Sequence, residues 1–213
     1  MDHQTTTHNT EPTIHHHKPS SPKHEGAKNI ASLLFILVLA PLTALILTAF
    51  VFQSYQVDGP SMETTLQNQD RLIVSKIPRT WSKITGNPYI PERGEIIIFH
   101  RKSVQDFGGG DKQLIKRVIA LPGERVVVKG GTLTVFNAEY PEGFQPDKTM
   151  EYGAVIGDTQ GNVDLTVPDN AVFVSGDNRS NSLDSRSFGP VKAQDIVGHL
   201  TYRVFPFDKA QRF

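Results

Sequence analysis

The stretch Gln113-Leu-Ile-Lys-Arg-Val-Ile-Ala120 carries the pattern that decides the fold. It is short, rich in β-branched residues and bounded by turn-forming residues, which is typical of a β-strand. Six further segments share these properties, and no amphipathic helical period of about 10–15 residues separates them. We therefore expect a mainly β protein with an antiparallel sheet or barrel. The six segments are residues 71–76, 94–100, 125–128, 132–136, 171–174 and 196–205.

The connections between these strands differ in length and composition. Residues 78–93, which contain Trp81 and three prolines, and residues 103–112, which contain three consecutive glycines, are expected to be surface loops. Within residues 129–170 the strand pattern weakens, and Gly and Asp become frequent. This region is expected to form a small accessory β-lobe of a main domain that covers residues 53–213.

A long apolar run precedes the strands. Residues 30–52 carry no charge, and at about 1.5 Å per residue a helix of this length crosses a hydrocarbon core of about 30 Å. Pro41 near its middle is tolerated in a membrane helix. A cleaved signal peptide is the alternative, but the run is long for one and lacks an Ala-x-Ala-like exit. We expect one permanent transmembrane helix.

The tail before this run is polar. Residues 1–29 are poor in large apolar residues and are expected to be disordered. They contain six of the eight histidines, and we favour a solvated tail over a metal site. Lysines precede the span, whereas Asp58 and Glu63 are the first charges after it. The positive-inside rule therefore predicts a single-pass protein of the plasma membrane, with a cytoplasmic tail and an extracytoplasmic domain. The lysines are Lys18, Lys23 and Lys28.

Charge and cysteine content exclude several classes of function. The 22 basic and 22 acidic residues balance, so no polyanion is indicated as a partner and nucleic-acid binding is not expected. The chain has no cysteine, which excludes disulfides, thiolate nucleophiles and zinc–thiolate sites.

Ser61 is the first candidate for chemistry. Gly59 can adopt backbone angles closed to other residues and Pro60 fixes its own φ, so Ser61 is expected on a stiff turn just beyond the span. Such a turn suits a nucleophile, although Gly-Pro-Ser is also ordinary turn chemistry.

A histidine or a lysine could serve as the base for this serine. His100 and His199 fall inside predicted strands, where structural roles are expected. Lys116 interrupts an apolar strand, and alternation puts Lys116 and Arg117 on opposite faces. A buried amine loses its charge more easily and then accepts a proton near neutral pH. An edge strand with both charges in water is the alternative.

The stretch Gly176-Asp-Asn-Arg-Ser-Asn-Ser-Leu-Asp-Ser-Arg-Ser-Phe-Gly189 is unusually polar for a segment between two apolar strands. Asp177 is expected to pair with Arg179, and Asp184 with Arg186. A network of such ion pairs and Asx hydrogen bonds would support a site rigidly.

Together these stretches resemble the bacterial type I signal peptidases. The resemblance covers residues 31 to about 203, and the single span resembles the Gram-positive branch of the family. It implies a membrane-anchored serine endopeptidase with a Ser/Lys dyad that acts in protein secretion and needs no cofactor and no metal. The matching motifs are Gly59-Pro-Ser-Met62, Arg93-Gly-Glu-Ile-Ile-Ile-Phe99, Lys116-Arg-Val-Ile-Ala-Leu-Pro-Gly-Glu124 and Gly176-Asp-Asn-Arg-x-x-Ser-x-Asp-Ser-Arg186.

The resemblance also implies roles for single residues. Ser61 would be the nucleophile, Lys116 the general base and Ser182 the residue that orients the lysine amine. The oxyanion would be bound by the Ser61 N–H and a second donor two residues earlier, where some family members have a serine. Here that position is Gly59, so its backbone or a water is expected to donate. The site-supporting residues would be Asp177, Asn178, Arg179, Asp184 and Arg186.

The implied partners are membrane lipid and precursor proteins that carry signal peptides. The precursor is expected to lie as an extended strand and to be cut after small residues at −1 and −3. Shallow apolar pockets would be lined by Tyr55, Val57, Met62 and Ile115, for each of which ordinary core packing is the alternative.

Two other functions fit parts of the sequence. A self-cleaving repressor-type Ser/Lys protease is disfavoured by the apolar span and by the lack of a DNA-binding segment. A non-enzymatic, membrane-anchored β-domain that binds exported chains would leave Lys116 and the polar stretch 176–189 without a role.

Overall fold

The computed structural model describes residues 23–101, 112–149 and 155–213. The chain divides into two units, residues 1–43 and residues 44–213. Residues 1–22 of the polar tail and the three consecutive glycines of the connection 103–112 lie outside the described residues.

The apolar run forms a helix. Helix α1 (Lys23–Ile46) is followed by a π-helical turn, η1 (Leu47–Val51). Residues Ser32–Val51 have a mean hydropathy of 2.7 and no buried side chain, and this segment is long and apolar enough to cross a membrane. Pro41 lies within the helix, as expected. The helix starts at Lys23, seven residues before the uncharged run begins.

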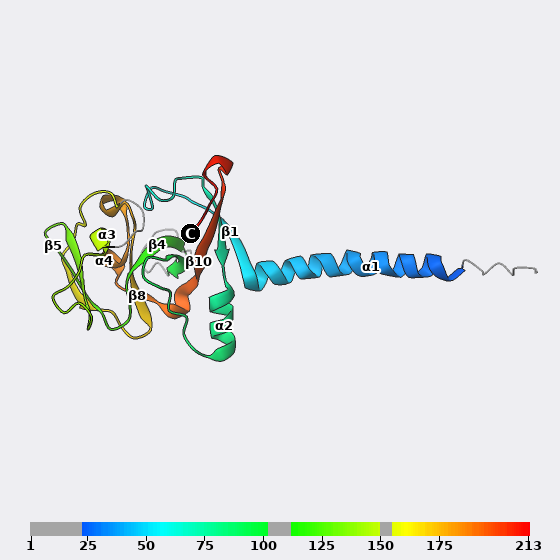
Figure 1. Cartoon of the computed structure of the whole chain (residues 1–213), viewed down its shortest axis with the longest axis horizontal. Coiled ribbons are helices and arrows are strands. Elements are labelled where there is room, and N and C mark those ends of the chain that lie inside the picture. The colour runs from blue at the N-terminus through cyan, green and yellow to red at the C-terminus, as the bar shows by residue number, and fades with distance from the viewer. Residues whose placement is uncertain (1–22, 102–111, 150–154) are drawn as a thin grey trace, which may run out of the picture. The chain divides into compact units, whose positions relative to one another are not determined.

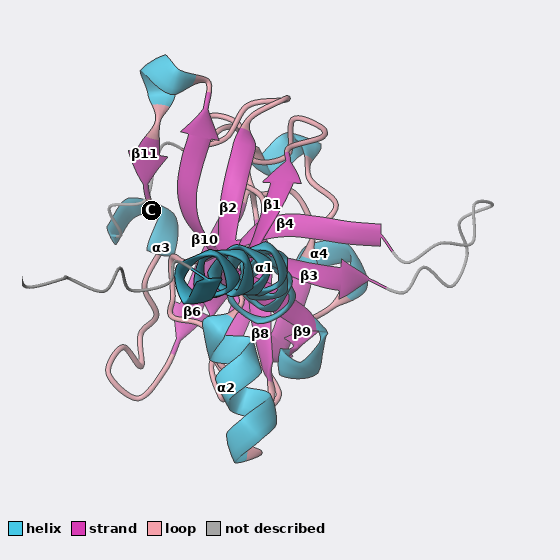
Figure 2. Ribbon diagram, turned by 90° about the vertical axis from the view of Figure 1, so that its right-hand side faces the viewer, coloured by secondary structure: helices cyan, strands magenta, loops and turns pink. Residues whose placement is uncertain are grey.

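The main sheet has eight strands in the order β1-β2-β10-β3-β4-β8-β9, with β11 paired to β10. All pairs are antiparallel, which confirms the mainly β fold expected from the sequence. Figure 2 shows β1, β2, β10, β3 and β4 grouped in the main sheet. The strands are β1 (Phe52–Gln56), β2 (Arg71–Ser75), β3 (Ile96–Arg101), β4 (Lys112–Ala120), β8 (Ala171–Ser175), β9 (Val191–Lys192), β10 (Ile196–Phe205) and β11 (Gln211–Arg212).

A second, three-stranded antiparallel sheet has the order β6-β5-β7. It comprises β5 (Arg125–Lys129), β6 (Thr132–Phe136) and β7 (Val163–Thr166) and occupies the end of the domain labelled β5 in Figure 1. Its alternating buried residues form one core cluster with Ile119 and Phe173 of the main sheet. This sheet falls in the region expected to hold the accessory lobe, whose boundaries stay a prediction.

A further core cluster lies under the turn that carries Ser61. Met62 and Leu66 are fully buried and pack with Leu72, Ile96 and Leu200. Because these side chains come from the turn and from three strands, the turn is fixed to the sheet from below. The apolar residues Met62 and Leu66, which follow Ser61, therefore anchor the Ser61 turn to the sheet.

One expected loop contains a helix. Helix α2 (Ile77–Thr85) occupies the first part of residues 78–93. Pro78 lies in its first turn, where no backbone donor is needed, and Gly86 ends it with φ 77°. Three prolines in residues 78–93 favour a loop. The first of them, Pro78, instead lies in the first turn of a helix, a position that tolerates proline.

The remaining helices are short. They are α3 (Pro146–Thr149), α4 (Ser185–Phe188) and the 3-10 turns η2 (Arg179–Asn181), η3 (Ala193–Asp195) and η4 (Phe207–Lys209). Two of them, η2 and α4, lie within the polar stretch 176–189, so this stretch is an ordered segment rather than a plain loop.

Candidate active site

Ser61 lies on a closed turn between β1 and β2. Val57 N–H donates to Asp70 O, and Gln69 N–H donates to Val57 O, both at 2.9 Å, so the two ends of the turn are tied together. Gly59 has φ 99°, a value that side chains rarely tolerate. The stiff turn expected from Gly-Pro-Ser is present.

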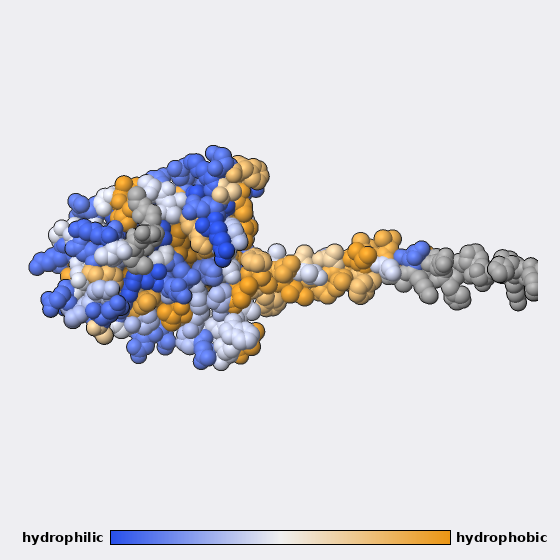
Figure 3. Space-filling view, in the orientation of Figure 1, coloured by the Kyte–Doolittle hydropathy of each residue, from blue (hydrophilic) through white to orange (hydrophobic). Residues whose placement is uncertain are grey.

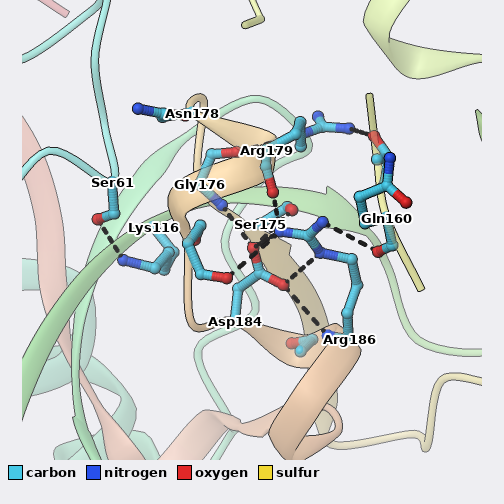
Figure 4. A network of polar contacts seen from close by, with 12 residues as sticks. Ser61, Lys116, Gln160, Ser175, Gly176, Asn178, Arg179, Asp184 and Arg186 are labelled. Carbon is cyan, nitrogen blue, oxygen red and sulfur yellow. Dashed lines mark hydrogen bonds and ion pairs between the residues drawn. The ribbon is translucent and has the colours of Figure 1, made fainter. Parts of the chain in front are cut away.

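The Lys116 side chain reaches Ser61 from β4. Its Nζ donates to Ser61 Oγ at 2.7 Å and to Ile115 O at 2.8 Å (Figure 4). Lys116 is only 3% exposed, so its amine contacts Ser61 in a place that solvent hardly reaches. The side chain therefore faces the domain interior, and the solvated edge strand that was the alternative is wrong.

The surroundings of Lys116 favour the neutral amine. Burial lowers its pKa to about 8, although the carboxylates of Asp184 and Asp177 act in the opposite direction. A lysine in water has a pKa near 10.4 and would be almost wholly protonated at neutral pH. A fraction of the Lys116 amine is thus available as a proton acceptor close to pH 7.

Asp184 is the centre of the polar stretch. Its Oδ2 accepts from Ser175 Oγ at 2.9 Å and from Gly176 N–H at 3.1 Å. The Arg186 guanidinium donates to both carboxylate oxygens, at 2.8 and 2.7 Å (Figure 4). Burial of Asp184 acts to raise its pKa, but these bonds outweigh it and leave the pKa below its usual value. The expected Asp184–Arg186 pair is present and ties the stretch to the end of β8.

The other expected pair is wrong. Asp177 binds Arg117, whose Nε and Nη2 donate at 2.8 and 2.6 Å. Arg179 instead binds Asp147 of α3 and donates to Gly176 O at 3.0 Å. The register of the sheet explains this, because Arg117 on β4 lies opposite Ser175 on β8, two residues before Asp177. Proximity along the chain did not predict the partner across the sheet.

The polar stretch 176–189 also donates hydrogen bonds to the backbone of the turn that carries Ser61. Asn178 N–H donates to Ser61 O at 3.1 Å, and its side-chain amide donates to Pro60 O at 3.3 Å. Thr65 Oγ1 donates to Asp177 Oδ2 at 2.5 Å. A Cβ on Gly176 would lie 2.4 Å from Ser61 O, so only glycine fits there. The two segments meet in direct backbone contact.

The chain's last long strand supports the same turn from another side. Arg203 of β10 is buried, and its Nη1 donates to Thr65 O at 2.9 Å and to Asp70 Oδ2 at 3.2 Å. The sequence does not single out Thr65, Asp70 or Arg203, and it indicates Arg117 only as the residue on the face opposite Lys116. A charged residue inside an apolar strand, as at Lys116, was the signal that could have found Arg117.

Two expected contacts are arranged differently. Ser182 Oγ is buried and has no hydrogen-bond partner among the described residues, and Lys116 donates to Ile115 O instead. The Ser182 hydroxyl does lie close enough to Asp184 to contribute to its lowered pKa. Gly59 N–H, expected as a second oxyanion donor, donates to the side chain of Asn68 at 3.1 Å.

A small cavity of about 120 Å³ adjoins the dyad. Tyr55, Val57 and Ile115 line it together with Ser61 and Lys116. Met62 does not, because it is fully buried in the core cluster below the turn. A larger cavity of about 850 Å³, lined by Thr65, Arg117 and Arg203 among others, contains neither Ser61 nor Lys116.

The two histidines of the domain lie elsewhere in the sheet. His199 of β10 contacts the Tyr89 hydroxyl through Nδ1 at 3.3 Å, and His100 lies near the end of β3. Within residues 23–101, 112–149 and 155–213, no three His, Asp or Glu side chains form a group that could hold a metal ion.

A buried lysine hydrogen-bonded to a serine, held by a charged loop on an antiparallel sheet, is the arrangement of a serine hydrolase. Residues 29–205 match the model of the family described as signal peptidase, peptidase S26. The chain is 37% identical over 189 residues to a protein of Synechocystis sp. named "Probable signal peptidase I-1", covering 87% of this chain and 86% of that one. It is also 37% identical to signal peptidase I of Bacillus caldolyticus, covering 76% of this chain and 84% of that one.

A crystal structure of a signal peptidase I from Enterococcus faecalis is similar as well, with 31% identity, a TM-score of 0.37, and coverage of 54% of this chain and 99% of that chain. The family assignment follows from the sequence comparisons. The chain belongs to the signal peptidase family, peptidase S26. It is a serine endopeptidase of the signal peptidase I kind, and its relatives support cleavage of signal peptides as its activity. The apolar N-terminal helix fits a membrane-anchored protein.

Proposed function

We propose that this chain removes signal peptides from exported precursors with Ser61 as nucleophile and Lys116 as general base. The observation that carries the proposal is the 2.7 Å hydrogen bond between Lys116 Nζ and Ser61 Oγ inside a nearly closed site. In its neutral form the amine accepts the Ser61 proton while Oγ attacks the carbonyl carbon at the cleavage site. The ammonium then gives the proton to the leaving amine, and the signal peptide stays on Ser61 as an ester.

The second half of the reaction uses the same groups. A water enters after the mature protein has left, the Lys116 amine takes its proton, and the hydroxide attacks the ester. The bond between Ser61 Oγ and the acyl carbon then breaks, the Lys116 ammonium returns the proton to Ser61 Oγ, and the signal peptide leaves with a free carboxyl end. The developing oxyanion accepts from the Ser61 N–H. Since Gly59 N–H is engaged with Asn68, we assign the second donor to a water rather than to the Gly59 backbone. This scheme requires no cofactor.

Ser182 is proposed to act on Lys116 once proton transfer begins. Its Oγ and the Ser61 carbonyl oxygen both lie within 2.4 Å of the position that a Cβ on Gly176 would occupy, so they are close neighbours. The Ser182 hydroxyl is buried, makes no hydrogen bond to Lys116 and lies close enough to Asp184 to act on that carboxylate. The Lys116 amine, once it releases Ser61, is the group that would approach this hydroxyl.

We place the small residues at −1 and −3 in the cavity beside the dyad. It measures about 120 Å³ and adjoins both Ser61 and Lys116. Tyr55, Val57 and Ile115 form its apolar wall, and β1 and β4 flank it. The precursor is proposed to lie extended between them.

For the topology, we propose that residues 1–29 are cytoplasmic and that residues 53–213 form the extracytoplasmic domain of a single-pass protein. Lys18, Lys23 and Lys28 before the span support this orientation. Protease added to intact spheroplasts is expected to digest the domain and leave the tail. Digestion of the tail with protection of the domain would show that the chain has the opposite orientation.

Cleavage of a labelled precursor by the purified full chain tests the activity. The wild type is expected to release the mature protein, whereas Ser61→Ala is expected to release none. Ser187→Ala is the matched control, because Ser187 is exposed on α4 and its side chain makes no described contact with the dyad. Equal cleavage by Ser61→Ala and the wild type would remove Ser61 as the nucleophile.

A further inference from the structure

Helix α2 presents its apolar side to the exterior of the domain. Ile77, Trp81 and Ile84 are 51%, 65% and 72% exposed. Their spacing of four and three residues places them on one face of the helix. In Figure 3 the region where Figure 1 places α2 is mostly pale or blue, with a small hydrophobic area at its edge. A helix on the surface of a water-soluble domain normally buries this face.

The opposite side of α2 packs on the domain. Ser82 Oγ accepts from Tyr89 N–H at 3.2 Å, and Arg79 and Ser82 are half-buried. The helix is therefore in its packed position, and no described residue covers its apolar face. An uncovered apolar stripe on an otherwise packed helix indicates a partner outside the domain.

Hydrogen bonds tie α2 to the end of the apolar span. Lys76, which caps the helix, donates its N–H to Val51 O at 2.7 Å and its Nζ to Thr48 O at 3.1 Å. Thr80 Oγ1 donates to Phe50 O at 2.8 Å. All these residues lie within the unit 44–213. Because the span ends at Val51, these bonds place α2 beside the segment that leaves the membrane.

The charges of this region have one sign. Residues 71–91 contain no acidic residue, and their basic residues are Arg71, Lys76, Arg79 and Lys83. Basic side chains beside an apolar stripe with a tryptophan are the composition of helices that lie in the membrane interface and are attracted to anionic lipid. Because α2 is hydrogen-bonded to the end of the apolar span, its exposed apolar face lies next to the membrane. We therefore expect lipid, rather than a protein, to cover this face.

We propose that α2 lies in the plane of the membrane interface, with Ile77, Trp81 and Ile84 among the upper acyl chains and Lys83 at anionic headgroups. The helix then attaches the peptidase domain to the bilayer at a second point, next to the span, and restricts its rotation about the single helix. This attachment is a property separate from peptide cleavage, so its failure would leave the peptidase assignment untouched.

Trp81 makes the test direct, because it is the chain's only tryptophan. The full chain is reconstituted into phosphatidylcholine vesicles with and without phosphatidylglycerol, in which part of the lipid carries brominated acyl chains. Trp81 emission is expected to be quenched by roughly half by the bromines, since interfacial helices insert ~5–10 Å deep, and to be shielded from aqueous iodide. Full iodide quenching without bromine quenching would overturn the proposal.

Two pairs of variants separate the apolar from the electrostatic contribution. Ile77→Ser/Ile84→Ser is expected to reduce bromine quenching in both kinds of vesicle, whereas Tyr140→Ser, an exposed aromatic change in another part of the domain, is not. Cleavage of a short soluble peptide in detergent, expected at the wild-type rate, verifies the fold of each variant.

The second pair removes charge. Lys83→Gln is expected to reduce the increase in quenching that phosphatidylglycerol causes and to leave quenching in phosphatidylcholine unchanged. Lys129→Gln removes the same charge from an exposed position on β5 and is the matched control. Equal losses in both variants would refute a role for Lys83 at the headgroups.

Discussion

The backbone N–H of Asn178 donates to the carbonyl oxygen of Ser61 at 3.1 Å, although the two residues are 117 positions apart in the sequence. The polar stretch 176–189 thus contacts the backbone of Ser61 directly, as well as the charged groups around it. Its rigidity is therefore part of how Ser61 is positioned, and changes in it are expected to reach the reaction.

The proposed dyad predicts non-additive losses. Ser61→Ala and Lys116→Ala are each expected to abolish precursor cleavage, and the double variant is expected to be no worse than either, because the two groups act as one unit. Single-turnover rates measure this, with Lys129→Ala as the control for loss of an exposed lysine. Retention of more than a few per cent of the rate in Lys116→Ala would assign the base elsewhere.

The pKa of Lys116 predicts the pH dependence. Only the neutral amine accepts the serine proton, so kcat/KM is expected to rise through a single limb near pH 8 and to fall as the pH drops below it. The profile is measured with a short peptide between pH 5 and pH 10. A limb near 6.5 that disappears in His100→Gln or His199→Gln would identify a histidine as the base instead.

The same shift predicts that the catalytic lysine destabilises the fold at neutral pH. The Lys116 pKa falls from 10.5 in the unfolded chain to about 8 in the folded domain, which corresponds to about 3 kcal/mol at 1.36 kcal/mol per unit. Below pH 8 both states are protonated and the cost is complete. Stability is gained as the pH rises from 8 to 10.5, because the unfolded state then binds more protons.

Lys116→Met is therefore expected to be inactive and more stable at pH 7, with an advantage that shrinks toward pH 10.5. Denaturant unfolding of the full chain in detergent measures the difference. If the variant were less stable than the wild type at pH 7, burial of the Lys116 amine would not lower the free energy of unfolding.

The Asp184 network predicts a large loss of stability on removing one partner. Asp184→Asn leaves the Arg186 guanidinium buried without its charge partner, and breaking a buried pair in this way costs about 3–5 kcal/mol. Asp164→Asn is the matched control, since the Arg125–Asp164 pair is exposed and its loss is expected to leave the free energy of unfolding nearly unchanged. Similar losses in both would mean that burial of Asp184 contributes little.

The cavity beside Ser61 predicts the specificity at −1. A precursor with Ala there is expected to be cut, whereas Leu or Phe is expected to lower kcat/KM by orders of magnitude through steric exclusion. Ile115→Ala should widen the cavity and restore part of the cleavage of the larger residues. Equal rates for Ala and Phe with the wild-type chain would contradict the assignment of this cavity.

Much of the fold could be predicted from local patterns. The strands were evident because β-branched runs bounded by turns need no long-range information, and mainly antiparallel pairing is confirmed. The sequence does not predict helix α2, because Pro78 is typical of a loop, although a proline in the first turn is compatible with a helix. The helix has only nine residues, so its amphipathic pattern is a weak signal beside three prolines.

The site was predictable where residue type alone restricts the partner. Lys116 in an apolar strand pointed to a buried amine, and the structure brings that amine to Ser61. The partner of Asp177 was not predictable, because it follows from the register of β4 against β8. The hydrogen bond from Arg203 to Thr65 O was not predictable either, because the two residues are 138 positions apart and no local pattern links them.

That hydrogen bond has a consequence for the order in which the enzyme becomes active during its own synthesis. The turn that bears Ser61 emerges early, but the guanidinium that fixes Thr65 O and Asp70 belongs to β10, which is made much later. A nascent chain halted before β10 would possess both Ser61 and Lys116 and still lack the contact that holds the turn. The turn that carries Ser61 is therefore completed only after β10, near the C-terminal end of the domain, has been translated.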